Sequence, residues 1–132
     1  MSDASEDQPK RIDCVLIAAG KYHDIDFARL ELLKLLGEDM RFRVRVFEDY
    51  ENLEALKAAD CIVTYTCDVV PSLAAQEVLK EWLHAGGRWY ALHGTNSILR
   101  MLDDGLWDAP RWAPAFMDLL GSQFISHPPI EP

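Results

Sequence analysis

The sequence has no long apolar segment. Its longest uninterrupted apolar run, from Cys14 to Ala19, is six residues, whereas a helix that crosses a bilayer needs about 20. The start of the chain, from Met1 to Asp7, is polar and acidic, and no apolar segment follows a basic one as it would in a secretory signal. We therefore expect no transmembrane helix and no secretory signal, and we expect a cytoplasmic protein.

Basic residues and cysteines are scarce. Thirteen Lys and Arg residues stand against 22 Asp and Glu residues, which gives a formal net charge of −9. The average field of such a protein repels nucleic acids and anionic membrane surfaces, so we expect neither as a partner. Cys14, Cys61 and Cys67 are an odd number with no CxxC spacing. This pattern favours buried free thiols in a reducing compartment.

Apolar runs alternate with amphipathic segments along most of the chain. Residues 1–11 are expected to form a flexible acidic tail, and a domain follows over 12–132. Its strands are predicted near 13–18, 42–47, 61–65 and 88–92, with a further candidate strand over 123–125. Its helices are predicted from Asp24 to Gly37, around Leu53 and Leu56, from Ser72 to Gly86, over about 97–102 and over 114–120. Asp24 and Ser72 are expected to be N-terminal caps, and Gly37 is expected to be a C-terminal cap.

This alternation of strands and helices predicts the fold class. Short strands joined through helices require right-handed crossovers, which build a parallel sheet with helices on both faces. Residues 42–47 alternate apolar and polar side chains, so this strand is expected near an edge. We predict an α/β fold, a flavodoxin-like three-layer sandwich with strand order 2-1-3-4, in which 123–125 would add a fifth strand.

Polar residues follow the predicted strands at their carboxyl ends, where ligands bind in such sheets. His23 and Asp24 follow the first strand, His93 follows the fourth and His127 follows the last candidate strand, so these four are the catalytic candidates. Histidine beside a carboxylate can exchange protons near neutrality or hold a divalent metal, so the same four are also candidate metal ligands. The candidate substrate-binding residues on this rim are Tyr22, Asp68, Thr95, Asn96 and Trp107.

Each candidate also has a purely structural interpretation. Asp24 could serve only as a helix N-cap, and Asp68 could only start a turn ahead of Pro71. Each rim histidine could be a surface or hydrogen-bonded structural residue, and His84, within a predicted helix, is expected to be solvated. Tryptophans are more often core residues than sugar platforms, although Trp107 lies in a loop-rich stretch.

The order of these motifs resembles the ThuA-like (trehalose utilisation) family of the class I glutamine amidotransferase-like superfamily. The resemblance rests on Gly20, His23 and Asp24, on Gln76, Leu79, Trp82, Leu83, Gly86 and Gly87, on Leu92, His93 and Gly94, and on Leu120, Gly121, Phe124, His127, Pro128 and Pro129. It covers the chain from Arg11 to the end and implies a flavodoxin-like fold. It also implies a role in carbohydrate utilisation, with a disaccharide or an oxidised sugar derivative as substrate.

Two departures from this resemblance shape the functional expectation. Amidotransferases carry a nucleophilic cysteine where this chain has His93, so glutamine hydrolysis is not expected. Domains of the family run past the length of this chain, so 12–132 is expected to be truncated at its C-terminal side, with a free sheet edge that favours homo-oligomers. We expect a carbohydrate-processing enzyme. The alternative is a non-catalytic sugar-binding or accessory module.

Overall fold

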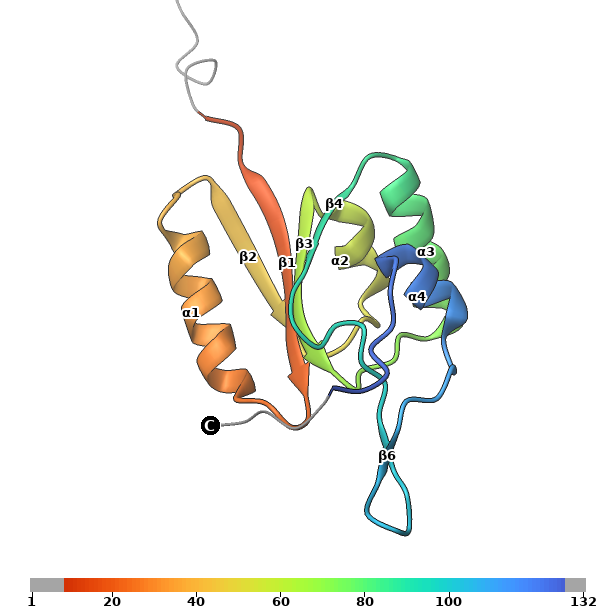
Figure 1. Ribbon diagram of the computed structural model, residues 1–132. Coiled ribbons are helices and arrows are strands. Elements are labelled where there is room, and N and C mark those ends of the chain that lie inside the picture. Colours follow the sequence, from red (N-terminus) through yellow and green to blue (C-terminus); the bar gives the residue numbers. More distant parts are fainter. Residues whose placement is uncertain (1–8, 128–132) are drawn as a thin grey trace, which may run out of the picture.

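Four parallel strands form the central sheet of the structure, a computed structural model that describes residues 9–127. The strands are β1 (Ile12–Gly20), β2 (Phe42–Phe47), β3 (Cys61–Cys67) and β4 (Arg88–Ala91). They lie in the order β2-β1-β3-β4, and every neighbouring pair is parallel. The predicted order and the edge position of β2 are therefore confirmed (Figure 1).

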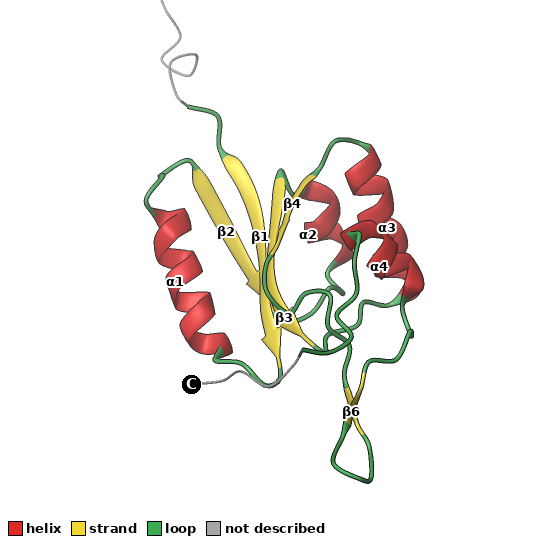
Figure 2. Cartoon of the chain, viewed as in Figure 1, coloured by secondary structure: helices red, strands yellow, loops and turns green. Residues whose placement is uncertain are grey.

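Helices cover both faces of the sheet and complete three layers. α1 (Ile25–Gly37) lies on one face, and α2 (Leu53–Ala58), α3 (Leu73–His84) and α4 (Pro114–Leu120) lie on the other (Figures 1 and 2). This is the predicted flavodoxin-like sandwich. In the described part of the chain, no helix is long and apolar enough to cross a membrane.

The central strand β1 is apolar throughout because both of its faces are buried. Val15 and Ile17 pack in the core cluster beneath α2, α3 and α4. Cys14 and Leu16 alternate with them and pack in the second cluster, against apolar side chains of α1. Successive side chains of a strand point to opposite faces. The continuous apolar run therefore indicates a strand that lies between two helical layers.

Side-chain caps begin three of the helices. Asp24, Asn52 and Ser72 each accept a hydrogen bond from the backbone N–H three residues later, at 3.0, 3.0 and 3.1 Å. The caps at Asp24 and Ser72 were predicted. The predicted C-terminal cap at Gly37 was wrong by one residue, because Gly37 is the last helical residue and Glu38 is the cap.

The apolar stripe of α1 is only partly covered. Leu33 and Leu36 pack against the cluster around Cys14, whereas Phe27 and Leu30 are 62% and 52% exposed. One helix covers this face, and it contacts β1, β2 and β3. Part of the stripe therefore remains in solvent.

Two predicted elements are replaced by irregular backbone and a hairpin. No helix forms over 97–102. There, β5 (Arg100–Met101) pairs antiparallel with β6 (Trp107–Asp108). Residues 123–125 form no strand, and the backbone N–H of Phe124 donates to the carbonyl of Asn96 at 3.0 Å. Residues 1–8, most of the predicted tail, and residues 128–132 lie outside the described residues.

Candidate functional site

The loop after β1 is held tightly against the end of β3. Gly20 has φ +112°, and a Cβ at this position would lie 1.9 Å from the carbonyl oxygen of Cys67, so only glycine fits without displacement. The next backbone N–H, of Lys21, donates to the same oxygen at 3.1 Å. Tyr22 follows with φ +68°, an uncommon conformation for a residue with a side chain. This close approach fixes the position from which His23 leaves β1.

The turn after β4 is also pressed onto β3. The N–H of Leu92 donates to the carbonyl of Thr64 at 2.8 Å. Gly94 has φ +85°, and a Cβ there would lie 2.3 Å from the carbonyl oxygen of Thr66. His93 lies between these two anchored residues with its side chain exposed at the carboxyl rim. The predicted placement of His93 in the turn after the fourth strand is therefore correct.

These two anchored loops bring His23 and His93 together. Their ring centroids are 4.8 Å apart, and Tyr65 of β3 lies 6.2 Å from the first ring and 6.3 Å from the second. The pKa of His23 is lowered, mainly by partial burial and to a smaller extent by the positive charge that His93 can carry. A lowered pKa favours the neutral imidazole, whose unprotonated ring nitrogen can accept a proton.

Two exposed aromatic side chains meet beside this pair. The hairpin of β5 and β6 carries Trp107 to Tyr22, and their ring centroids are 4.7 Å apart in an edge-to-face arrangement. Trp107 is 46% exposed and Tyr22 is 53% exposed. Aromatic faces with part of their area in water are suited to stack against the apolar faces of sugar rings. Two of the predicted substrate-binding residues are thus neighbours.

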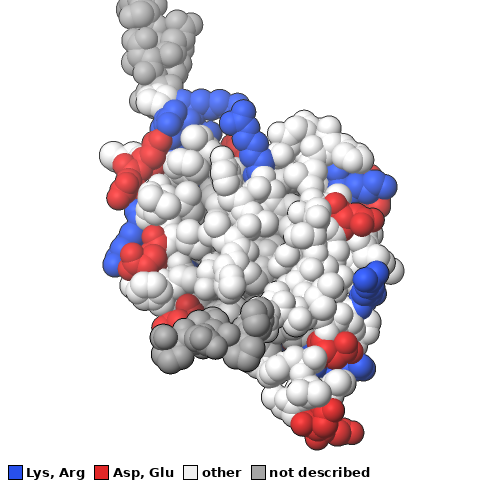
Figure 3. Space-filling model, viewed as in Figure 1, with Lys and Arg blue, Asp and Glu red and all other residues white. Residues whose placement is uncertain are grey.

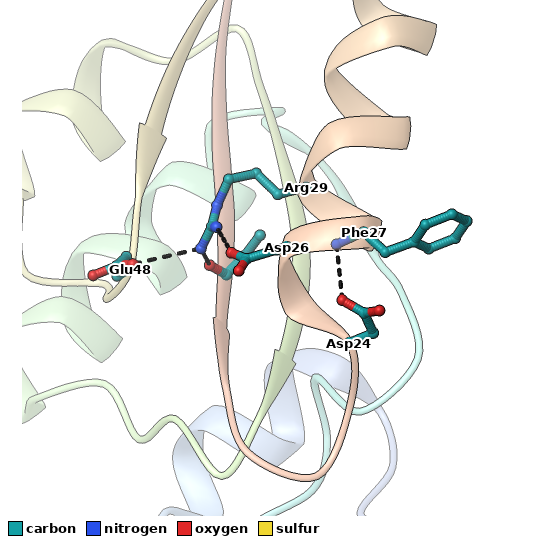
Figure 4. Close-up of polar contacts among 6 residues, drawn as sticks. Asp24, Asp26, Phe27, Arg29 and Glu48 are labelled. Atoms are coloured by element: carbon teal, nitrogen blue, oxygen red, sulfur yellow. Dashed lines mark hydrogen bonds and ion pairs between the residues drawn. The ribbon is translucent and has the colours of Figure 1, made fainter.

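Asp24 is committed to the start of α1 (Figure 4). Its carboxylate accepts from the backbone N–H of Phe27 at 3.0 Å. One turn further along the helix, Arg29 donates to the carbonyl of Ala18 at 2.7 Å and ties α1 to the end of β1. These contacts fit the structural interpretation of Asp24, and they fix the orientation of the helix that follows His23.

Three predicted substrate-binding residues have partners within the fold. Asp68 pairs with Lys21 at 3.1 Å and accepts from the N–H of Leu99 at 3.1 Å, so it connects the loop after β3 to two other segments. Thr95 is buried, and its hydroxyl donates to the carbonyl of Leu92 at 2.7 Å. Asn96 donates to the hydroxyl of Ser122 at 2.9 Å.

His127 lies in the last described segment, which the contact between Phe124 and Asn96 holds to the turn after β4. Its ring centroid is 5.9 Å from that of Phe124. In residues 9–127, no three His, Cys, Asp or Glu side chains are grouped so that they could hold a metal ion. The structure therefore brings together two of the four catalytic candidates, His23 and His93, and this pair does not fit a site with three protein ligands.

Comparison with known proteins supports the assignment of the fold. No family model matches the sequence, and no curated protein matches it. The crystal structure of a ThuA-like protein from Bacteroides uniformis superposes with a TM-score of 0.59 at 18% sequence identity, and the match covers 85% of this chain. This chain has the fold of that ThuA-like protein. It spans 44% of the length of the matched chain, and the predicted resemblance is confirmed at the level of fold.

On this ThuA-like fold, the described cysteines are not arranged as nucleophiles. Cys67 follows β3 on the same rim but is 1% exposed, and burial raises the pKa of its thiol. Burial also raises the pKa of Cys61, and it raises that of Cys14 to about 12. Thiols become nucleophiles where their pKa is lowered, so these environments support the expectation that glutamine is not hydrolysed.

Two features of the structure were not predicted. Tyr65 faces both imidazoles, and its position near the end of β3 was the only sequence signal that could have indicated this. A cavity of about 430 Å³ lies between α4 and the segment 121–125, next to Arg111 and Gln123. The histidine pair does not line this cavity, so the paired rings and the cavity are separate features.

Proposed function

We propose that the chain is a carbohydrate-processing enzyme whose site is the rim around His23 and His93. The substrate class is a disaccharide or an oxidised sugar derivative. His23 accepts a proton from the bound sugar, and His93 is the partner that delivers one. The 4.8 Å separation of the two rings carries this proposal, because proton transfer to and from neighbouring atoms of one small substrate needs two such groups within its reach.

The aromatic pair supports a sugar as the ligand. Tyr22 adjoins His23 in sequence, and Trp107 contacts Tyr22 from the hairpin. Stacking of a sugar on these rings would hold its hydroxyl groups near the imidazoles. The left-handed conformation of Tyr22 adds to this support, since strained backbone concentrates at functional sites.

A divalent metal is not needed for this proposal. Among residues 9–127, the imidazoles that lie together are those of His23 and His93, and Asp24 is engaged by the backbone of α1. That set does not fit a site with three protein ligands, so each proton transfer is assigned to the side chains alone.

The second candidate function is a non-catalytic sugar-binding module. It is favoured by the exposure of the histidine pair, because enzymes usually enclose their substrates in a concave site. In this alternative the aromatic rings bind the sugar and the imidazoles only donate or accept hydrogen bonds. The two candidates share a binding surface and differ in turnover.

The test combines a binding screen with a turnover assay. Disaccharides and their keto derivatives are screened by ligand-observed NMR, and each binder is then assayed for conversion. We expect Trp107→Ala to remove binding and His93→Gln to remove turnover while binding remains. His84→Gln, at an exposed histidine of α3, is the matched control and should change neither. Binding without turnover in the unmodified chain would support the module, and the absence of any sugar binding would refute both candidates.

A further inference from the structure

A second cavity lies at the opposite end of the sheet from the histidine pair. It has a volume of about 200 Å³ and is lined by residues at the amino ends of β1 and β2 and by α2, among them Arg11, Arg43, Arg45 and Ala55. We propose that this cavity binds a small dianion, namely a phosphate group, free or carried on a small molecule. We refer to it below as the arginine cavity.

The sheet register explains why the arginines converge. Arg43 pairs with Asp13 and Arg45 pairs with Val15 of β1. Neighbouring partners in a sheet point to the same face, and Val15 packs beneath α2, α3 and α4. Arg43 and Arg45 therefore point to the α2 face of β2, with their Cα atoms about 6.6 Å apart.

Small side chains on α2 leave room for a ligand beside these arginines. Ala55, Ala58 and Ala59 line the arginine cavity from the helix side. Because β2 is the edge strand, the alanines leave its α2 face without a covering side chain, and the hollow remains. Its volume of about 200 Å³ equals that of several water molecules at about 30 Å³ each, which suits a phosphate group with a small body attached.

The charge of the arginine cavity is not neutralised within the fold. Among the described residues, neither Arg43 nor Arg45 forms an ion pair, and Arg45 only stacks over Phe47 at 5.3 Å. The one carboxylate that lines the cavity belongs to Asp13, which pairs with Arg11 at 3.1 Å. Three arginines thus line the cavity with one carboxylate, and a second carboxylate, of Asp60, accepts from the backbone N–H of Asp13 at 2.8 Å.

This local excess of positive charge contrasts with the rest of the chain. The formal net charge is −9, yet Lys and Arg side chains gather at the end of the molecule where the described chain begins (Figure 3). Guanidinium groups bind phosphate oxygens in a bidentate manner. A phosphate dianion in the arginine cavity would therefore supply the anionic partner that Arg43 and Arg45 lack within the fold.

Inorganic phosphate and a hexose 6-phosphate are the probes. Each is titrated into the full chain at constant ionic strength while backbone amide shifts are followed by NMR. We expect saturable shifts in residues 11–15, 43–47 and 55–59. Arg43→Gln and Arg45→Gln should each weaken binding about tenfold or more, because each removes a charge-assisted bidentate contact. Tighter binding of the hexose phosphate would assign the cavity to a phosphorylated small molecule, and equal affinities would assign it to the phosphate group alone.

Arg88→Gln is the matched control. Arg88 is an exposed arginine at the start of β4, at the same amino end of the sheet but on the opposite edge strand, and does not line the cavity. Its replacement removes the same charge and should leave affinity unchanged. The proposal is overturned if all three variants weaken binding equally, which would indicate only a general field, or if phosphate gives no saturable shift. Far-UV circular dichroism of each variant verifies that the fold is retained.

Discussion

Replacement of Gly20 by alanine should destabilise the protein more than its backbone conformation alone explains. An alanine at φ +112° costs about 1–2 kcal/mol for the left-handed conformation. Its Cβ would also lie 1.9 Å from the carbonyl oxygen of Cys67, so the end of β1 must move away from β3. That movement breaks the hydrogen bond from Lys21 to Cys67, worth about 1 kcal/mol, and adds about 1–2 kcal/mol of overpacking. We expect Gly20→Ala to lower the free energy of unfolding by about 3–5 kcal/mol.

Gly86→Ala separates the two contributions. Gly86 has φ +100°, and a Cβ there would meet no described atom within 4 Å. This variant therefore carries the conformational cost without the overlap, and we expect a loss of about 1–2 kcal/mol. The entropy lost by the unfolded chain when glycine becomes alanine is the same in both variants, so it cancels in the difference.

Urea unfolding at 25 °C, followed by tryptophan fluorescence and circular dichroism, measures both variants. The expected difference between them is about 2–3 kcal/mol. Equal losses in the two variants would refute the argument from close approach. Because Gly20 anchors the loop that carries His23, the Gly20→Ala variant should also separate His23 from His93, and the pKa of His23 should then move toward its ordinary value.

The other predictions concern Asp24 and His23 in the loop after β1. Asp24→Ala should lower the free energy of unfolding by about 1 kcal/mol, because the N–H of Phe27 loses its acceptor, whereas Asp24→Asn should retain most of the cap. Urea unfolding measures both variants, and an equal loss in the two would contradict this role. NMR titration of the imidazole protons should find the pKa of His23 below 6.5. His93→Gln should raise this pKa only part of the way toward 6.5, since burial is the larger cause of the shift. An unchanged pKa in His93→Gln would contradict the coupling, and His84→Gln is the control. Because the folded chain binds this proton less readily than the unfolded chain, the contribution of His23 to stability is present above pH 6.5 and is lost as the pH falls toward its folded pKa.

The sheet could be predicted from the sequence because its strands carry their own burial pattern. The run from Cys14 to Ala19 is apolar on both faces, and residues 42–47 alternate, which distinguishes a central strand from an edge strand. The segment 97–102 could not be predicted in this way. Its conformation depends on Asp68, which accepts from the N–H of Leu99 and whose own N–H donates to the carbonyl of Ser97. Contacts between residues so far apart in sequence leave no local pattern.

The same distinction applies to the candidate site. The approach of His23 to His93 follows from strand order, because β1 and β4 are both neighbours of β3. The contact between Tyr22 and Trp107 depends on a hairpin, whereas the sequence pattern predicted a helix over 97–102 followed by a loop-rich stretch. The role of Asp24 could not be decided from sequence, since the same carboxylate can cap a helix or face a ligand. Topology could thus be predicted, whereas the direction of each side chain could not.

The three cysteines give this chain an internal reporter of its own opening. Cys14 lies in β1, and Cys61 and Cys67 lie at the two ends of β3, so all three are on the two central strands. All are free and buried, and alkylating reagents require an accessible thiolate. Cys14 and Cys61 pack beneath α1, so reagent reaches them when α1 detaches from the sheet or when β1 and β3 separate. The rate of modification at these two thiols would then report both kinds of opening and would not respond to fraying of the hairpin.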